Sequence, residues 1–272
     1  MTRLKSHLER NNDMQLQKVK MRVESQIAYI TITNPPANAL DQQTFQELEQ
    51  VMNEVACDSE IKVVVLTGEG KMFIAGANIK EFTFIDNENL GTEYARKGQQ
   101  VFQKIEQLKK PVIAMINGAC LGGGLELAMA CHLRIAADTA KLGLPELNLG
   151  LIPGFGGTQR LVRLTNRGKA TELILTGDRI DGKEASLIGL VSKSVPQDEL
   201  EATVKQMAEK ISAKSSVSIG AALSAMDQGI VFGQEKGYFS EAELFGSLFT
   251  TEDAKEGIQA FIEKRPPIFR NR

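Results

Sequence analysis

Four short runs of apolar and β-branched residues recur along the first half of the chain, with longer helical segments between them. The runs cover residues 27–33, 61–66, 112–116 and 133–136, and turn-forming Gly, Pro or Asn residues border most of them. Near-continuous apolar strands are buried on both faces, which is typical of a sheet covered by helices. The sequence therefore predicts an α/β fold built around such a sheet.

The segments between these runs carry apolar residues at helical spacing. Asp41 is a suitable N-cap for a helix that ends near Val55, and another helix is expected over about residues 93–108. The apolar face of the first helix comprises Phe45, Leu48, Val51, Met52 and Val55.

Strand signals thin out after about residue 165, and helical segments take over. These helices are expected over residues 169–175, 182–188, 198–213, 216–228, 234–248 and 253–263. We therefore divide the chain into a polar leader at 1–14, an α/β core at 15–205 and a C-terminal helical region at 206–272.

Composition argues against several classes of function. The 272 residues carry a formal net charge of −2, whereas nucleic-acid binding favours a basic excess. Cys57, Cys120 and Cys131 form no C-x-x-C pair, which favours a reducing compartment over a disulfide framework. His7 and His132 are too few for a metal site or a histidine-dependent triad. The leader lacks the apolar core of a secretory signal, and no stretch has the length of a membrane span, so we expect a cytoplasmic protein.

The first segment that departs from ordinary core composition is FIAGANIK at residues 73–80, directly after a strand and its turn. Small residues allow the backbone to approach a ligand closely, and a helical turn that follows would present free N–H groups. A tight strand-to-helix turn without a ligand explains the same residues.

The second segment, residues 118–128, contains three consecutive glycines followed closely by Glu126. Consecutive glycines weaken the start of a helix, which makes sense if the backbone must contact something there. Glu126 is the only charged residue between Pro111 and Cys131. We expect it to be buried near a helix N-terminus, where the dipole favours ionisation and desolvation opposes it. An exposed carboxylate in a first helical turn is the alternative.

The third segment covers residues 142–160 and is rich in Pro and Gly, which gives a loop a fixed shape. Glu146 is the only charged residue between Lys141 and Arg160. It is either a functional carboxylate or a turn residue that caps the next segment.

Together, the three segments predict one kind of chemistry. Two glycine-rich turns at strand ends can each offer a backbone N–H to one oxygen atom, as in an oxyanion hole. Two isolated carboxylates can serve as acid and base, with pKa values set by burial. With no evident nucleophile–histidine pair or metal cluster, we expect proton transfer beside a carbonyl group.

These segments resemble the crotonase (enoyl-CoA hydratase/isomerase) superfamily, and the resemblance runs from about residue 15 to the end of the chain. The triple glycine with its glutamate and the PGFGGTQRL loop are specific in combination, whereas a glycine triplet alone is not. The matching motifs are NPPANAL at 34–40, AGANIKE at 75–81, NGACLGGGLELA at 117–128, LGLPELNLGLIPGFGGTQRL at 142–161 and FIEKRPPIF at 261–269.

The resemblance implies a crotonase-type spiral of repeated ββα units with a C-terminal helical region that builds trimers, often paired into hexamers. It implies that the N–H groups of Ala77 and Gly123 bind the thioester carbonyl of an acyl-CoA. Glu126 and Glu146 would hold one water, with Glu126 activating it for addition to C3 and Glu146 supplying a proton to C2. No separate cofactor is needed, because coenzyme A (CoA) is part of the substrate.

The resemblance also implies where CoA lies. The corresponding positions are Ala37, Ala39, Ala75, Ala77, Asn78, Ile79, Lys80, Gly122, Gly123, Phe261 and Lys264. Of these, Phe261 and Lys264 resemble residues that reach the nucleotide of a neighbouring subunit. Asn78 replaces an Asp that is usual in the family, so the helix start loses a charge. We expect a modest effect on loop order or CoA affinity.

Three alternatives accompany the hydratase interpretation. A Δ3,Δ2-enoyl-CoA isomerase needs only one carboxylate, and the presence of both favours hydration. Methylglutaconyl-CoA hydratases resemble the chain in LGGGLELA and EKRPP, which leaves a branched, carboxylated substrate open, although Phe82, Phe84 and Ile85 favour an apolar acyl tail. A non-catalytic acyl-CoA- or RNA-binding scaffold predicts a lost glutamate or a broken glycine turn, and the sequence has neither.

Overall fold

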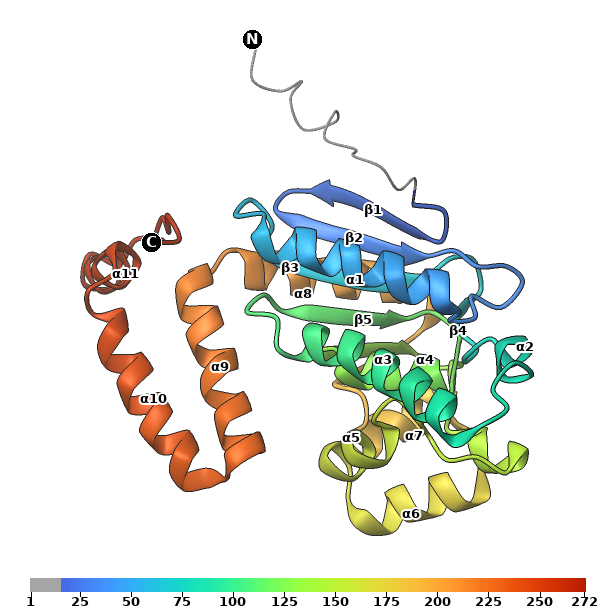
Figure 1. Cartoon of the computed structure of the whole chain (residues 1–272). Helices are drawn as coiled ribbons and strands as arrows, with labels where there is room; N and C mark the ends of the chain where they lie inside the picture. The colour runs from blue at the N-terminus through green and yellow to red at the C-terminus, as the bar shows by residue number, and fades with distance from the viewer. Residues whose placement is uncertain (1–15) are drawn as a thin grey trace.

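A six-stranded sheet forms the centre of the protein in the computed structural model, which describes residues 16–272 (Figure 1). The expected leader at 1–14 lies outside the described residues. Strands β1 and β2 are antiparallel, and every later neighbouring pair is parallel, which confirms the α/β class. In sheet order the strands are β1 (Val19–Glu24), β2 (Ile27–Ile32), β3 (Val63–Gly68), β5 (Val112–Ile116), β7 (Leu133–Ala137) and β10 (Lys193–Val195).

A second sheet is made of four short strands, β4 (Met72–Ile74), β6 (Ala119–Leu121), β8 (Lys141–Gly143) and β9 (Ile180–Asp181). The first three are parallel, and β9 is antiparallel to β8. From β3 onward, three successive turns of the chain (β3 and β4, β5 and β6, β7 and β8) each give one strand to each sheet and then form a helix. The structure thereby confirms the expected spiral of ββα units.

The helices of two spiral turns carry most of the site described below. Strands β3 and β4 lead into α2 (Ile79–Phe82) and α3 (Glu88–Glu106), and β5 and β6 lead into α4 (Gly123–Ala130). After β8 the chain forms the 3₁₀ helix η1 (Pro145–Leu149) and then α5 (Gly157–Leu164). The site therefore lies beside the segments that follow β4, β6 and β8 in consecutive turns of the spiral.

Helix α1 (Gln42–Cys57) begins as predicted, because the Asp41 side chain accepts a hydrogen bond from the Thr44 N–H. Its predicted apolar face is buried. Figure 1 shows α1 on one face of the large sheet and α8 on the other. The remaining elements of the core are α6 (Arg167–Thr176), α7 (Gly182–Leu187), η2 (Gln197–Glu199) and α8 (Leu200–Ser212).

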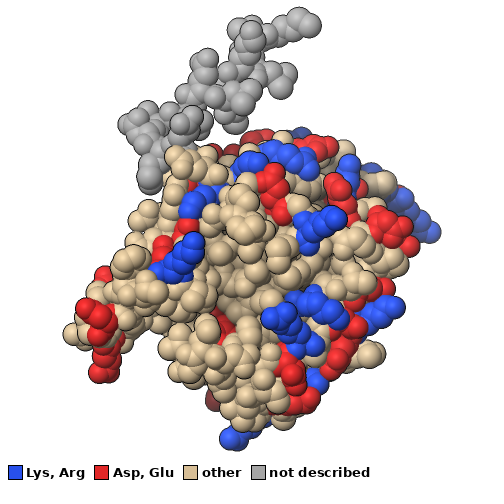
Figure 2. Space-filling view, turned by 90° about the vertical axis from the view of Figure 1, so that its right-hand side faces the viewer, with Lys and Arg blue, Asp and Glu red and all other residues tan. Residues whose placement is uncertain are grey.

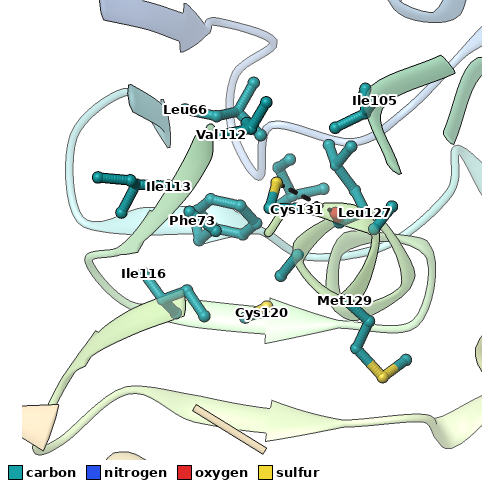
Figure 3. Close-up of a cluster of buried hydrophobic side chains, with 14 of the residues drawn as sticks. Leu66, Phe73, Ile105, Val112, Ile113, Ile116, Cys120, Leu127, Met129 and Cys131 are labelled. Carbon is teal, nitrogen blue, oxygen red and sulfur yellow. Dashed lines mark hydrogen bonds between the residues drawn. The ribbon is translucent and has the colours of Figure 1, made fainter. Parts of the chain in front are cut away.

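The hydrophobic core fills the space between the two sheets and α4. Figure 3 shows Leu66 and Val112 of the large sheet near Phe73 of β4 and Leu127 of α4. All four side chains are fully buried. This packing fixes the ends of β4 and β6 relative to the first turn of α4.

The expected division near residue 205 falls inside α8. Leu200, Val204 and Ala208 of this helix are buried, and the helix packs against the large sheet. The core therefore extends to Ser212, and a helical arm follows. Its helices are α9 (Ser216–Phe232), α10 (Gln234–Leu248) and α11 (Glu252–Ile262).

Helices α9 and α10 of the arm form an antiparallel hairpin that extends away from the sheets in Figure 1. They approach closely where Gly229 meets Gly237, since a Cβ on Gly237 would lie 2.7 Å from the Gly229 Cα. Within residues 16–272, no helix combines the length and apolar character needed to cross a membrane.

Candidate active site

The three glycine-rich segments converge on one pocket of about 730 Å³. They contribute Ala75, Gly76, Ala77, Gly122, Gly123, Glu126, Pro145 and Glu146 to its lining. Helix α2 borders the pocket and lies on the face shown in Figure 2, where uncharged residues cover much of the surface and charges of both signs are interspersed. The structure thus brings together the segments that the sequence singled out.

The Ala77 N–H is directed by a short parallel pairing between the 37–40 loop and the chain after β4. Leu40 donates its N–H to Gly76 O at 2.9 Å and accepts from Asn78 N at 2.7 Å. In parallel pairing, the residue between these two partners directs its own N–H to the opposite side. The N–H of Ala77 is therefore not used by Leu40, and Ala77 lines the pocket.

Gly123 offers the second backbone donor because it is the first residue of α4, and a first-turn N–H has no intrahelical acceptor. The turn before it depends on Gly122, whose φ of +51° is a backbone conformation that favours glycine. A Cβ on Gly122 would lie 3.7 Å from the Gly76 Cα, so the turns that carry the two donors are adjacent.

Glu126 is buried in the first turn of α4, with 1% of its surface exposed, as its isolation in an apolar run predicted. Its Oε1 accepts hydrogen bonds from Phe155 N at 2.8 Å and Gly157 N at 2.7 Å. Burial and the nearby Glu146 raise the pKa of Glu126 to about 8, although these two N–H donors oppose the shift. The carboxyl group therefore titrates near neutral pH, which suits an acid or a base.

Glu146 lies in η1, partly buried, on the same pocket wall. Its Oε1 would be 3.1 Å from a Cβ on Gly122, which places the carboxyl group beside the turn that carries Gly123. Among the described residues, its buried Oε2 has no hydrogen-bond partner. Burial raises the pKa of Glu146 as well. A buried carboxyl oxygen of this kind marks a place for a ligand or water.

The remaining predicted contact residues divide into three groups. Ala75 and Ile79 line the pocket, whereas Ala37, Ala39, Asn78 and Lys80 lie beside it without lining it. Asn78 caps α2, because its side chain accepts from Lys80 N at 3.2 Å. Phe261 and Lys264 are outside this pocket at the end of the arm, and Phe261 is 85% exposed. Their contact with a second subunit stays a prediction.

The sequence did not identify Phe155 as a site residue. Its N–H binds Glu126, and its ring lines the pocket. The ring packs in an aromatic cluster, with centroids 5.3 Å from Phe45, 5.7 Å from Tyr94 and 5.8 Å from Phe102. The sequence feature that could have indicated a role for Phe155 is its position as the one aromatic residue in a loop made almost entirely of Gly and Pro.

The pocket continues away from the two glutamates into an apolar part. None of the described residues that line it is Lys or Arg, and its acids are Glu88, Glu126 and Glu146. The apolar lining residues are Ile79, Phe82, Ile85, Tyr94, Leu149, Leu151 and Ile152.

The spiral of ββα units, with its C-terminal helices, is the crotonase class of fold. Residues 22–272 match the sequence model of the family described as enoyl-CoA hydratase/isomerase, and the chain belongs to this family.

Similar proteins with known names extend this result. The chain is 48% identical to a probable enoyl-CoA hydratase of Bacillus subtilis, over 93% of this chain and 98% of that protein. It is 44% identical to a short-chain-enoyl-CoA hydratase of Clostridium acetobutylicum, over 93% and 97%. The crystal structure of an enoyl-CoA hydratase from Bacillus anthracis superimposes with a TM-score of 0.90 at 38% identity, covering 94% of this chain and all of that chain.

Proposed function

We propose that the protein is an enoyl-CoA hydratase, a hydro-lyase that adds water reversibly to the C2–C3 double bond of a trans-2-enoyl-CoA and forms the 3-hydroxyacyl-CoA. The observation that carries this proposal is the presence of two buried carboxyl groups and two adjacent backbone donor turns in one pocket. An isomerase requires one carboxyl group, so the second is best explained by the addition of water.

The thioester carbonyl oxygen binds between the N–H groups of Ala77 and Gly123. When water adds at C3, negative charge develops on this oxygen, and preorganised donors stabilise the charge in a site from which water is largely excluded. The two N–H groups therefore lower the barrier more than they strengthen substrate binding.

Glu126 and Glu146 together carry one proton near neutral pH, because burial and mutual repulsion prevent both from ionising. The ionised carboxylate accepts a proton from water as the C3–O bond forms, and the protonated carboxyl gives its proton to C2. The pair ends each turnover with the one proton it began with.

The assigned roles make Glu126 the base and Glu146 the acid. Without a ligand, burial favours the shared proton on Glu126. The water bound between the two groups transfers this proton to Glu146 before addition.

The lining of the pocket favours an uncharged acyl tail. A carboxylated tail such as that of methylglutaconyl-CoA needs a cationic partner when buried, and none of the described lining residues is Lys or Arg. Phe82, Ile85 and Ile152 instead offer apolar surface to a short or medium alkyl chain.

The test is a panel of CoA thioesters, in which loss of the conjugated enoyl absorbance is followed with the purified protein. We expect turnover of crotonyl-CoA and longer trans-2-enoyl-CoAs, and little turnover of methylglutaconyl-CoA. Turnover confined to a trans-3-enoyl-CoA would replace this proposal with the isomerase.

The arm supports a proposal for assembly into a trimer or hexamer. Phe232, Phe239, Phe245 and Phe249 are more than half exposed along α9, α10 and the turn after them. An apolar surface of this extent is typical of an interface between subunits.

A further inference from the structure

Arg160 lies directly behind the loop that holds Glu126. It belongs to α5, yet its side chain turns back toward the loop and is only 10% exposed. Its Nη1 donates to Phe155 O at 2.8 Å. Its Nη2 and Nε donate to Oε2 of Glu106 at 2.8 and 3.3 Å. Because Glu106 is the last residue of α3, Arg160 connects that helix to the loop.

Phe155 is therefore held at both of its backbone polar groups. Its N–H donates to Glu126 and its carbonyl accepts from Arg160. Gly156 makes room for the guanidinium, since a Cβ there would lie 2.4 Å from Nη1, and its φ of +105° also favours glycine. The next residue, Gly157, supplies the other N–H to Glu126. The guanidinium is thus bound to the short loop that carries both N–H donors of Glu126.

We propose that Arg160, oriented by Glu106, is a positioning residue that fixes the 155–157 loop and, through it, the orientation and charge of the Glu126 carboxyl group. This inference rests on the proposed role of Glu126 in hydration. Arg160 does not line the pocket, so it acts through Glu126 and not on the substrate.

Charge adds to the geometry. Two ionisable groups act on Glu126 directly, Glu146 from η1 and Arg160 from α5. Glu106 of α3 pairs with Arg160. Glu146 raises the pKa of Glu126, and the positive charge of Arg160 lowers it. Glu106 compensates part of that positive charge through its ion pair with Arg160. Arg160 and Glu106 therefore influence the Glu126 proton in opposite directions.

The experiment compares Arg160→Met, Arg160→Lys and Glu106→Gln with the control Arg163→Met, which changes an exposed arginine of the same helix. Arg160→Met should lower kcat for crotonyl-CoA about 10- to 100-fold, as loss of an outer-shell partner does, with little change in KM. In the pH profile of kcat, the pH at which activity falls on the alkaline side (the alkaline limb) should rise by up to about one unit, because the pKa of Glu126 rises. Glu106→Gln should move that limb to lower pH. Arg160→Lys should restore the limb but only part of the rate.

A second measurement does not depend on activity. A ¹³C-NMR titration of glutamate-labelled protein, with the Glu126 signal assigned through Glu126→Gln, reports the same shifts without substrate. A protein that shows these shifts but hydrates no enoyl-CoA would contradict the proposed function and leave the Arg160 inference standing. Wild-type rate and titration in Arg160→Met would overturn the inference, as would equal effects in Arg163→Met. If Arg160→Met does not fold, Glu106→Gln carries the test: it must move the alkaline limb to lower pH, and an unchanged limb overturns the inference.

Discussion

The ring of Phe155 lies so close to Gly98 of α3 that a Cβ on the glycine would be 2.3 Å from a ring carbon. The same phenylalanine donates its backbone N–H to Glu126. A glycine in the middle of a helix therefore determines where one wall of the pocket and one hydrogen bond to the Glu126 carboxyl group are placed.

Gly98→Ala should displace the Phe155 ring. We expect a loss of about 1–3 kcal/mol in the free energy of unfolding, as in other overpacked cores, together with a lower kcat. Gly246→Ala is the matched control, because it lies in helix α10 with open space around its Cβ, and it should stabilise the protein slightly. Urea unfolding and crotonyl-CoA hydration measure both effects. If Gly98→Ala lowers stability but leaves kcat unchanged, the packing of Phe155 against Gly98 is not needed for catalysis.

Glu126→Gln and Glu146→Gln keep the side-chain shape and remove the titrating group. Each should lower kcat by about 10²–10⁴-fold with substrate binding largely intact. The two losses should not add in the double variant if both groups act on one water, as proposed. Steady-state kinetics of the three variants provide the test. Near wild-type hydration by Glu126→Gln, with Glu146→Gln inactive, would favour a single-carboxylate enzyme.

Gly123→Pro removes the N–H donor at the first helical position, where proline is otherwise well tolerated. The rate should fall about 10²–10³-fold. Because any Cβ at this position comes within 3.2 Å of the Phe155 ring, Gly123→Ala is the necessary control, with the same crowding but an intact N–H. Equal rates in the two folded variants would show that Gly123 is not a donor.

The buried Glu126 should make stability depend on pH. Its pKa rises from an ordinary 4.5 to about 8 in the folded protein, so between these values the folded state keeps a proton that the unfolded state has lost. Stability from this group is therefore lost as pH rises through that range. Glu126→Gln should raise Tm relative to wild type more at about pH 9 than at about pH 5. Exposed Glu54→Gln is the control, and an increment that does not vary with pH would contradict the raised pKa.

Lys264→Ala tests the pocket shared between subunits. It should raise KM for CoA thioesters with little change in kcat, and more at low than at high ionic strength, because salt screens an exposed charge pair. Lys255→Ala, on the exposed surface of α11, should leave KM unchanged. Light scattering that gave an active monomer of 29.8 kDa would rule out a shared pocket.

Local sequence patterns predicted the parts of the site that depend on local chemistry. A single charge in a long apolar run predicted the burial of Glu126, and the structure confirms it. Glycine is required at the neighbouring positions for several structural reasons, and the close approach of a ligand is only one of them. Gly122 has a positive φ, and a Cβ on Gly124 would lie 2.2 Å from Ile74 O of β4. Asn78 keeps the capping role of the usual Asp without its charge.

Contacts between distant residues were beyond the reach of sequence patterns. Arg160 and Glu106 are 54 positions apart, and nothing in either local segment shows that the spiral brings them together. Phe155 and Glu126 are 29 positions apart and meet only because α4 and α5 pack against each other. Exposed Phe261 illustrates a further limit, since its expected partner is another chain.

Ala77, Gly123, Glu126 and Glu146 line the pocket from segments that follow β4, β6 and β8, whereas many of its apolar residues lie around α2, the start of α3 and residues 149–152. Under the proposed function, the part of this lining that comes from residues 82–99 contributes no group to bond making. If these residues contact the acyl group as proposed, substitutions in residues 82–92 should alter which acyl groups are accepted while the reaction itself is preserved. A fold divided in this way can diversify into many substrate ranges through changes in one short surface segment.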